Sequence, residues 1–220
     1  KIIYKILVVL NTLYQVTHLN VFYYLEGKIS GSWGRIGCFS AHPLKNFNAC
    51  GDAGFITTND DDVARKIVRM RNHGLIDRET AEEFGFVSRM DAIQAAILRF
   101  RLPLLPQIAK KRQEHAALYR SILDPKTVIS PPERATEFNT WHTFVIQVEE
   151  RDKLRSFLAS RKIETAIHYP IPIHLQPAGR YLGYGQGDFP NAESQANRIL
   201  SLPVHQYLTE DQVHLVAKSI

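Results

Sequence analysis

The segment GCFSAHPLKNFNACGDAGFITTND, residues 37–60, places a single lysine, Lys45, among small, polar and turn-forming residues. The stretch GSWGRIG before it holds three glycines in seven residues and predicts turns. At its other end, GFITTN alternates apolar and polar residues as a short strand does. Lys45 is therefore expected in a loop that leads into a strand. A lone lysine in a loop is usually only a solvated charge, so its neighbours must decide whether it has a chemical role.

The composition is that of an ordinary globular protein, with 220 residues, 45% hydrophobic and 22% charged. A net charge of +5 is compatible with an anionic partner or simply with a mildly basic surface. No block of lysine and arginine and no interleaved aromatic motif is present, so we expect no nucleic-acid partner. A phosphorylated small molecule suits the charge equally well.

The cysteines and histidines predict neither a disulfide framework nor a metal site. Cys38 and Cys50 form no C-x-x-C pair, and two thiols in a chain of this size favour a reducing cytoplasm. The nine histidines show no H-x-x-x-H or H-E-x-x-H spacing, so we expect no bound zinc.

Residues 1–25 are apolar enough to suggest a membrane span or a signal peptide. Polar residues inside the run, Asn11, Gln15, His18 and Asn20, oppose a span because unpaired polar side chains are costly in hydrocarbon. No A-x-A-like cleavage site follows the run, which opposes a signal peptide. We expect no membrane partner, and either one or two buried strands or a core helix here.

Capping signals and hydrophobic spacing predict several helices and strands. Asn59 or Asp60 is expected to cap a helix over 60–72, and Ser88 with Asp91 suggests a capping box for the next helix. Thr209 with Gln212 suggests the same for the last helix. The remaining expected elements are a long helix from Pro106 to Asp124, a strand over 141–148, a helix over 151–162, a strand over 164–169 and a helix over 191–200. The order of elements after residue 126 describes a small α/β domain.

Several separated motifs together resemble one family. These are CFSAHPLKNFNACGDAGFITTND, RMRNHG, SRMDAIQAAIL, IETAIHYPIPIHLQPA, GDFPNAE and LSLP, in that order over about residues 26–220. They closely resemble sugar aminotransferases of the DegT/StrS type, which carry pyridoxal phosphate on fold type I. The resemblance implies an α/β chain comprising a remnant of the cofactor-binding large domain (1–102), a connecting helix (103–125) and a small C-terminal domain (126–220).

The resemblance also implies roles for individual residues. Lys45 would hold the cofactor as a Schiff base and shuttle a proton, which requires a partly deprotonated amine. Ser40 matches the serine that binds the cofactor phosphate. A related class that dehydrates sugars has histidine at the lysine position, so Lys45 favours transamination. His42 is either a site residue or a packed loop histidine. His168 and Tyr169 either approach the nucleotide sugar or pack under a proline-rich loop.

The implied reaction transfers the amino group of glutamate to a keto sugar carried on a nucleotide diphosphate. Pyridoxal 5'-phosphate would supply the electronic chemistry. Family members usually form homodimers with the site at the subunit boundary, so a homodimer is expected.

The sequence departs from the family pattern at several positions. Members of the family have about half of their chain before the lysine, whereas 44 residues precede Lys45 here. Thr12 stands where the family aspartate pairs with the pyridine nitrogen, and Val87 replaces an asparagine that reaches the partner's cofactor phosphate. Ala41 replaces an aromatic residue, and Ala53 replaces a glycine that would matter if the position needs positive φ. These departures leave open a non-catalytic remnant of the family as an alternative.

Overall fold

The computed structural model describes residues 15–17 and 24–220, and its contacts divide the chain into two compact units. The first contains the chain up to Lys110 together with Arg134–His142, and the second contains Lys111–Glu133 and Thr143–Ile220. The domain boundaries expected from the sequence stay a prediction. The buried strands or core helix expected over residues 1–25 fall mostly outside the described residues.

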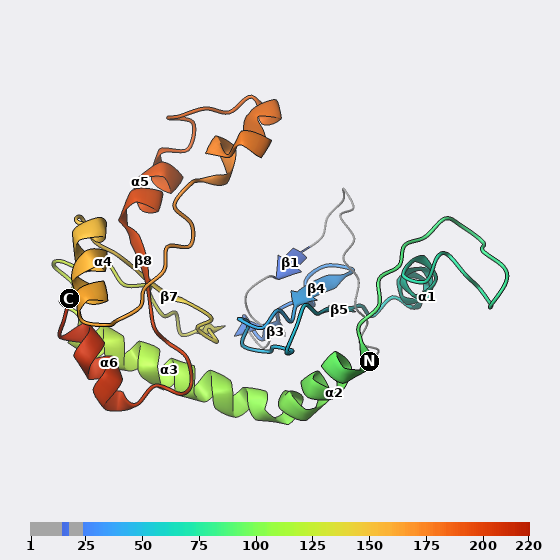
Figure 1. The fold of residues 1–220 in the computed structure, drawn as a ribbon, viewed down its shortest axis with the longest axis horizontal. Coiled ribbons are helices and arrows are strands. Elements are labelled where there is room, and N and C mark those ends of the chain that lie inside the picture. Colours follow the sequence, from blue (N-terminus) through green and yellow to red (C-terminus); the bar gives the residue numbers. More distant parts are fainter. Residues whose placement is uncertain (1–14, 18–23) are drawn as a thin grey trace. The chain divides into compact units, whose positions relative to one another are not determined.

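The described part of the first unit contains two small sheets. In one, β4 (Gly37–Ser40) lies between β1 (Gln15–Thr17), to which it is parallel, and β5 (Gly54–Thr57), to which it is antiparallel (Figure 1). The other has the order β3-β2-β6 and is antiparallel throughout. Its strands are β2 (Tyr24–Leu25), β3 (Lys28–Ile29) and β6 (Glu137–Phe138).

The alternation of side chains along β4 and β5 gives each face of this strand pair its own core. Phe39 stands opposite Phe55, and their rings stack with centroids 4.8 Å apart. Cys38 stands opposite Ile56 on the other face. The Phe39 face packs against Phe47, Ala49, Leu98 and Leu105, and the Cys38 face packs against Val63 and Ile67. Helix α1 (Asp61–Met70) therefore covers one face of the sheet, and the loop of residues 41–53 and helix α2 (Ala92–Arg101) cover the other.

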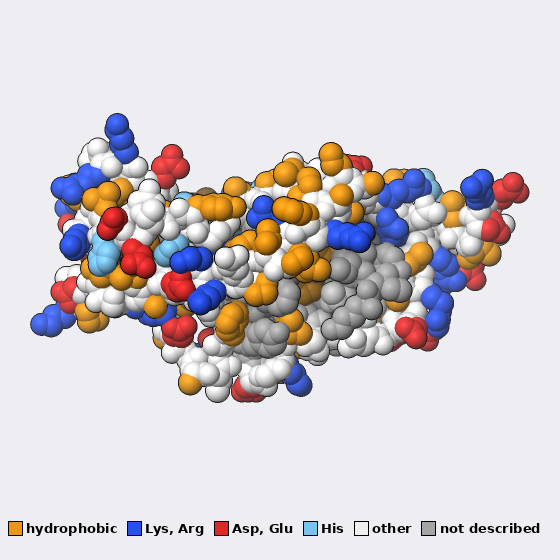
Figure 2. All heavy atoms as spheres, turned by 90° about the horizontal axis from the view of Figure 1, so that it is seen from below, with side chains coloured by type: hydrophobic (Ala, Val, Ile, Leu, Met, Phe, Trp, Pro, Cys, Tyr) orange, Lys and Arg blue, Asp and Glu red, His pale blue; other side chains and the backbone are white. Residues whose placement is uncertain are grey.

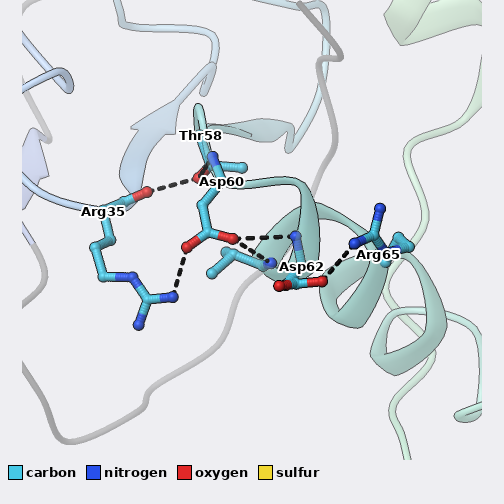
Figure 3. A network of polar contacts seen from close by, with 6 residues as sticks. Arg35, Thr58, Asp60, Asp62 and Arg65 are labelled. Atoms are coloured by element: carbon cyan, nitrogen blue, oxygen red, sulfur yellow. Dashed lines mark hydrogen bonds and ion pairs between the residues drawn. The ribbon is translucent and has the colours of Figure 1, made fainter.

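Asp60 starts helix α1, as predicted. Its Oδ1 accepts hydrogen bonds from the backbone N–H groups of Asp62 (3.0 Å) and Val63 (3.1 Å), and its Oδ2 pairs with the Arg35 guanidinium at 2.6 Å (Figure 3). Thr58 Oγ1 accepts from the Asp60 N–H and donates to the Arg35 carbonyl, which ties the end of β5 to the helix start. The Arg35 hydrogen bond is the largest cause that lowers the pKa of the Asp60 carboxyl.

Two helices joined by a 3-10 turn follow the first sheet. Helix α2 (Ala92–Arg101) ends at η1 (Leu102–Leu104), which contains Pro103, and α3 (Leu105–Ile122) has Pro106 in its first turn, as predicted. The capping box expected from Ser88 and Asp91 is wrong. Asp91 is the N-cap residue of α2, but its side chain makes no capping hydrogen bond.

The second unit is built on two antiparallel strands, β7 (Phe144–Gln147) and β8 (Ile199–Leu202). On one face, Phe144 pairs with Leu202 and Ile146 with Leu200, and all four side chains are buried. Tyr119 of α3 stacks on Phe144 with ring centroids 5.1 Å apart. The other elements are α4 (Arg151–Ser160), η2 (Ile173–Leu175), η3 (Pro177–Leu182), α5 (Pro190–Arg198) and α6 (Glu210–Ala217). The Thr209–Gln212 capping box of α6 is confirmed.

Two expected elements of this unit differ from the structure. The segment 164–169 is not a strand, because only Ala166 pairs with β8, and the prolines that follow have no N–H to extend the ladder. The helix expected over 191–200 ends at Arg198, and Ile199 and Leu200 instead begin β8. Buried Arg151 donates to the carbonyls of Ala196 and Ile199 at this helix end, which favours termination there.

Among residues 15–17 and 24–220, no helix is both long enough and apolar enough to cross a membrane. The same part of the chain contains no group of three or more His, Cys, Asp or Glu side chains placed to hold a metal ion.

Candidate functional site

The lysine loop, residues 41–53, connects two strands that stand side by side. Ser40 at the end of β4 pairs with Gly54 at the start of β5, and the Ala41 N–H continues the ladder to the Ala53 carbonyl at 2.8 Å. The Ala49 N–H donates to the Ala41 carbonyl at 2.9 Å and closes the loop on itself. The loop therefore has a definite backbone path from the end of one strand to the start of the next.

Lys45 ends a tight turn that its neighbours hold from both sides. Its N–H donates to the His42 carbonyl at 2.8 Å, and the Leu44 N–H donates to Nδ1 of the His42 ring at 3.2 Å. Asn48 Nδ2 donates to the Pro43 carbonyl at 2.7 Å. These bonds fix the backbone from which the Lys45 side chain projects, so the position of Lys45 is set locally.

Lys45 lies where the loop passes from solvent into the core. The side chain before it, Leu44, is exposed, whereas Asn46 and Phe47 after it are buried. Asn46 Nδ2 donates to the Thr140 carbonyl at 2.9 Å, and Phe47 packs edge-on against Phe55 with ring centroids 5.7 Å apart. Lys45 itself is half-buried, and burial lowers the pKa of its amine below the ordinary value of 10.5. A larger fraction of the amine is therefore neutral and nucleophilic at a given pH.

Ser40 and His42 flank the entrance to the loop. Ser40 is half-buried, and its Oγ accepts a hydrogen bond from the His42 N–H at 3.3 Å. A serine hydroxyl in this role keeps its own proton to donate to a ligand oxygen. The His42 side chain is exposed, and its Nδ1 accepts from the Leu44 N–H, so the imidazole helps to shape the turn. The structure thus brings Ser40, His42 and Lys45 together within one strand end and one turn.

The turn before β5, Gly51–Gly54, does not need glycine for a left-handed backbone. The backbone has no positive φ at Gly51, Ala53 or Gly54, so alanine at position 53 causes no backbone strain. Ala53 instead packs against the Phe39 core. Gly54 is small for a different reason, because a Cβ there would lie 2.9 Å from the Phe39 carbonyl oxygen of the neighbouring strand. The Gly51–Gly54 turn is shaped by close packing.

His168 and Tyr169 belong to the second unit. His168 Nδ1 lies 2.8 Å from Oγ of Ser201 on β8, while Tyr169 is 70% exposed. The two rings contact each other edge-on with centroids 5.5 Å apart. Both residues are exposed, and the two interpretations of this pair, approach to the nucleotide sugar or packing under the proline-rich loop, stay predictions.

Sequence reasoning missed the residues that hold these side chains in place. Ser201 supports His168, and Asn46 anchors the residue after Lys45 to the Thr140 carbonyl. Buried His174 binds Glu193 through Nε2 at 3.0 Å, 19 residues away in the chain. Ser201 lies within the LSLP motif, but no spacing rule connects that serine with a histidine 33 residues earlier. Only the fold shows these pairs.

The sequence profile described as the DegT/DnrJ/EryC1/StrS aminotransferase family matches residues 22–220. The chain belongs to this family. Lys45, Ser40 and the turn before β5 all lie inside the matched range.

Two curated relatives and one solved structure show what the chain is similar to. It is 38% identical over 198 residues to a pleiotropic regulatory protein of Geobacillus stearothermophilus, covering 89% of this chain and 53% of that protein. It is 37% identical over 196 residues to the dTDP-3-amino-3,4,6-trideoxy-alpha-D-glucose transaminase of Streptomyces venezuelae, covering 89% and 52%. The crystal structure of S. venezuelae DesV aligns with a TM-score of 0.86 and 35% identity over 90% of this chain and 53% of that one.

These comparisons confirm the family and the α/β, fold type I class. The chain spans about half the length of the curated relatives it matches. Aminotransferases of this family depend on pyridoxal phosphate, and the residues described fit such a group on one side. A half-buried lysine with a lowered pKa is the nucleophile that an aldehyde requires. A serine hydroxyl at the end of a strand is a hydrogen-bond donor for a phosphate.

Proposed function

We propose that this chain contributes the lysine-bearing part of a pyridoxal phosphate-dependent aminotransferase that acts on a nucleotide-diphosphate keto sugar, with glutamate as amino donor. The observation that carries the proposal is Lys45, held half-buried on a loop anchored in the core and with a pKa lowered by burial. The family and a relative named as a dTDP-sugar transaminase support the substrate class.

Each candidate residue then has a task that its surroundings suit. Lys45 would bind the cofactor covalently and then move protons as a free amine, for which a lowered pKa is suitable. Ser40 would donate its hydroxyl proton to the cofactor phosphate. His42, His168 and Tyr169, all exposed in the described structure, would face the substrate. The cofactor, when bound, supplies the electron sink for the reaction.

We also propose a homodimer and a cytoplasmic location. Large hydrophobic side chains are exposed in the first unit, among them Phe84, Ile93 and Phe100, and Figure 2 shows hydrophobic side chains at the surface of the face it draws. Such surface favours association with a second copy. Light scattering that gives a clean monomer mass at micromolar concentration would count against the homodimer. The location rests on Cys38 and Cys50, whose thiols are not joined in a disulfide.

A second candidate is a non-catalytic member of the family, and Val87 favours it. Val87 stands where family members carry an asparagine that contacts the partner's cofactor phosphate, and its side chain is exposed on a segment bridged to Asn72. An isopropyl group cannot donate a hydrogen bond to a phosphate. Cofactor affinity is the quantity that separates the two candidates.

The deciding experiment is cofactor capture by the purified chain. The protein is incubated with pyridoxal phosphate, reduced with borohydride and digested, and the modified lysine is located by mass spectrometry. We expect modification of Lys45 and its loss in Lys45→Ala, while Lys162→Ala, at an exposed lysine, leaves it unchanged. With substrate present, Lys45→Ala should lower the amino-transfer rate at least about 10²-fold.

Modification spread evenly over exposed lysines, or absent at Lys45, would favour the non-catalytic candidate. A Val87→Asn variant sharpens the distinction. If phosphate binding is the deficit, this variant should retain more cofactor after desalting than the unaltered chain, because the amide restores a donor.

A further inference from the structure

Ser201 is a buried serine whose backbone is fixed by two neighbours. It lies opposite Val145 in the β7–β8 pair, and its N–H and carbonyl exchange hydrogen bonds of 2.7 and 3.2 Å with Ala166. Its flanking residues Leu200 and Leu202 point into the core, so the Ser201 side chain points to the opposite face of the strand pair. The residue is 5% exposed, and its hydroxyl has little access to water.

The hydroxyl of Ser201 contacts one ring nitrogen of His168. His168 follows Ala166, the residue that pairs with Ser201, by two positions, and its Nδ1 lies 2.8 Å from Ser201 Oγ. His168 as a whole residue is exposed. One ring nitrogen is therefore occupied by a fixed protein group, and Nε2 is the nitrogen that can meet a ligand.

The direction of this hydrogen bond follows from counting protons. A serine hydroxyl has one proton and two lone pairs, and Nδ1 of His168 is the partner that the described residues offer to Ser201 Oγ. If Nδ1–H donated to the serine oxygen, the serine proton would be left in a buried place without an acceptor. A buried donor without a partner is costly, whereas an oxygen with an unused lone pair is tolerated more readily.

We propose that Ser201 donates to Nδ1 and thereby holds His168 in the form that carries its proton on Nε2. His168 would then present an N–H donor toward the ligand, and Ser201 would be a positioning residue that acts through His168. A donor at this place suits an oxygen acceptor of a nucleotide sugar, either a diphosphate oxygen or a sugar hydroxyl. The identity of that ligand rests on the proposed function. The assignment of the His168 proton to Nε2 does not.

The test is nitrogen-15 NMR of the histidine side chains, with His168 assigned by its loss in His168→Gln. In the unaltered chain we expect Nε2 in the range of protonated nitrogen and Nδ1 in the unprotonated range. Ser201→Ala should shift both signals toward a mixture of the two tautomers. Ser201→Thr keeps a hydroxyl and should restore the original pattern.

A matched control is Ser219→Ala. Ser219 is also buried in the second unit, and its Oγ donates to the Leu215 carbonyl at 2.7 Å and accepts from Arg161 at 3.4 Å. This variant removes a buried serine hydroxyl that does not bind His168, so the His168 signals should be unchanged. A wild-type spectrum with Nδ1 protonated, or identical spectra for Ser201→Ala and the unaltered chain, would overturn the proposal.

Adding ligand separates the proton arrangement from the proposed function. The probes are dTDP and then dTDP-glucose, and the Nε2 signal of His168 is followed at each step. A shift with dTDP supports a diphosphate acceptor, and a shift only with dTDP-glucose supports a sugar hydroxyl. If neither probe shifts Nε2 while the tautomer pattern stands, the ligand role of His168 is overturned although Ser201 still orients the ring.

Discussion

The lysine loop and the segment 166–189 carry the two groups of candidate site residues, and they are held in different ways. The lysine loop closes on its own backbone, and Ala41, Phe47 and Ala49 are part of a hydrophobic core. The segment 166–189 leaves large side chains such as Tyr181 in solvent. Side-chain pairs between residues distant in the chain hold it, namely His168 with Ser201 and His174 with Glu193.

This difference separates the proposed cofactor site from the proposed substrate site in physical terms. A loop that shares its residues with a core has little freedom, because moving Lys45 would also move Phe47. A segment fixed by a few polar pairs can change its ligand-facing side chains without a loss of packing. We therefore expect core substitutions to damage the first region and polar or pH changes to damage the second.

The largest expected effect comes from the core side chain of the lysine loop. Phe47→Ala should lower the free energy of unfolding by about 3–5 kcal/mol, because it empties a buried aromatic position against Phe55. Leu44→Ala is the matched control in the same loop. Leu44 is 76% exposed, so its truncation should change stability by no more than about 0.5 kcal/mol. Equal effects in chemical denaturation would show that the loop is not part of the core.

Two glycines provide the second comparison, Gly54 at the end of the lysine loop and Gly185 in the segment 166–189. Gly54→Ala should destabilise the protein by about 1–3 kcal/mol, since the new Cβ would lie 2.9 Å from the Phe39 carbonyl oxygen. Gly185→Ala lies in the other region, where a Cβ would have no atom within 4 Å and φ is not positive. That change should be neutral or slightly stabilising because it restricts the unfolded chain. Thermal unfolding of both variants measures the contrast.

The smallest effect concerns pH and the segment 166–189. The hydrogen bond with His174 lowers the pKa of the Glu193 carboxyl below its ordinary value of 4.5, and the N–H groups of Gly187 and Phe189 lower it further. The ionised carboxylate therefore stabilises the folded state above pH 4.5, and this contribution is lost as the pH falls through the lower folded pKa.

Glu193→Gln should consequently lower the melting temperature at pH 6 and approach the unaltered chain at more acidic pH. Glu164→Gln, at an exposed glutamate in the same unit, is the control and should show no such dependence. A melting-temperature difference between Glu193→Gln and the unaltered chain that stays constant from pH 6 to pH 3.5 would contradict the assignment.

Local signals predicted elements that depend on neighbouring residues better than elements that need a distant partner. Asp60 as the cap of α1, the strand in GFITTN and the capping box of α6 all follow from residues close together in the chain. The strand expected over 164–169 was wrong because its alternation was not matched by a continuous partner, and Ala166 alone pairs with β8. Ile199 and Leu200 left the expected helix because β7 offered them a strand partner.

The sequence by itself determined the family, the candidate lysine and serine, the Asp60 cap of α1 and the Thr209–Gln212 capping box of α6, because these depend on short motifs and nearest neighbours. The tertiary structure alone decided that Lys45 is half-buried between exposed Leu44 and buried Phe47. It also decided that Ser201 meets His168. Burial and long-range hydrogen bonds depend on which segments pack together, and no spacing within a motif contains that information.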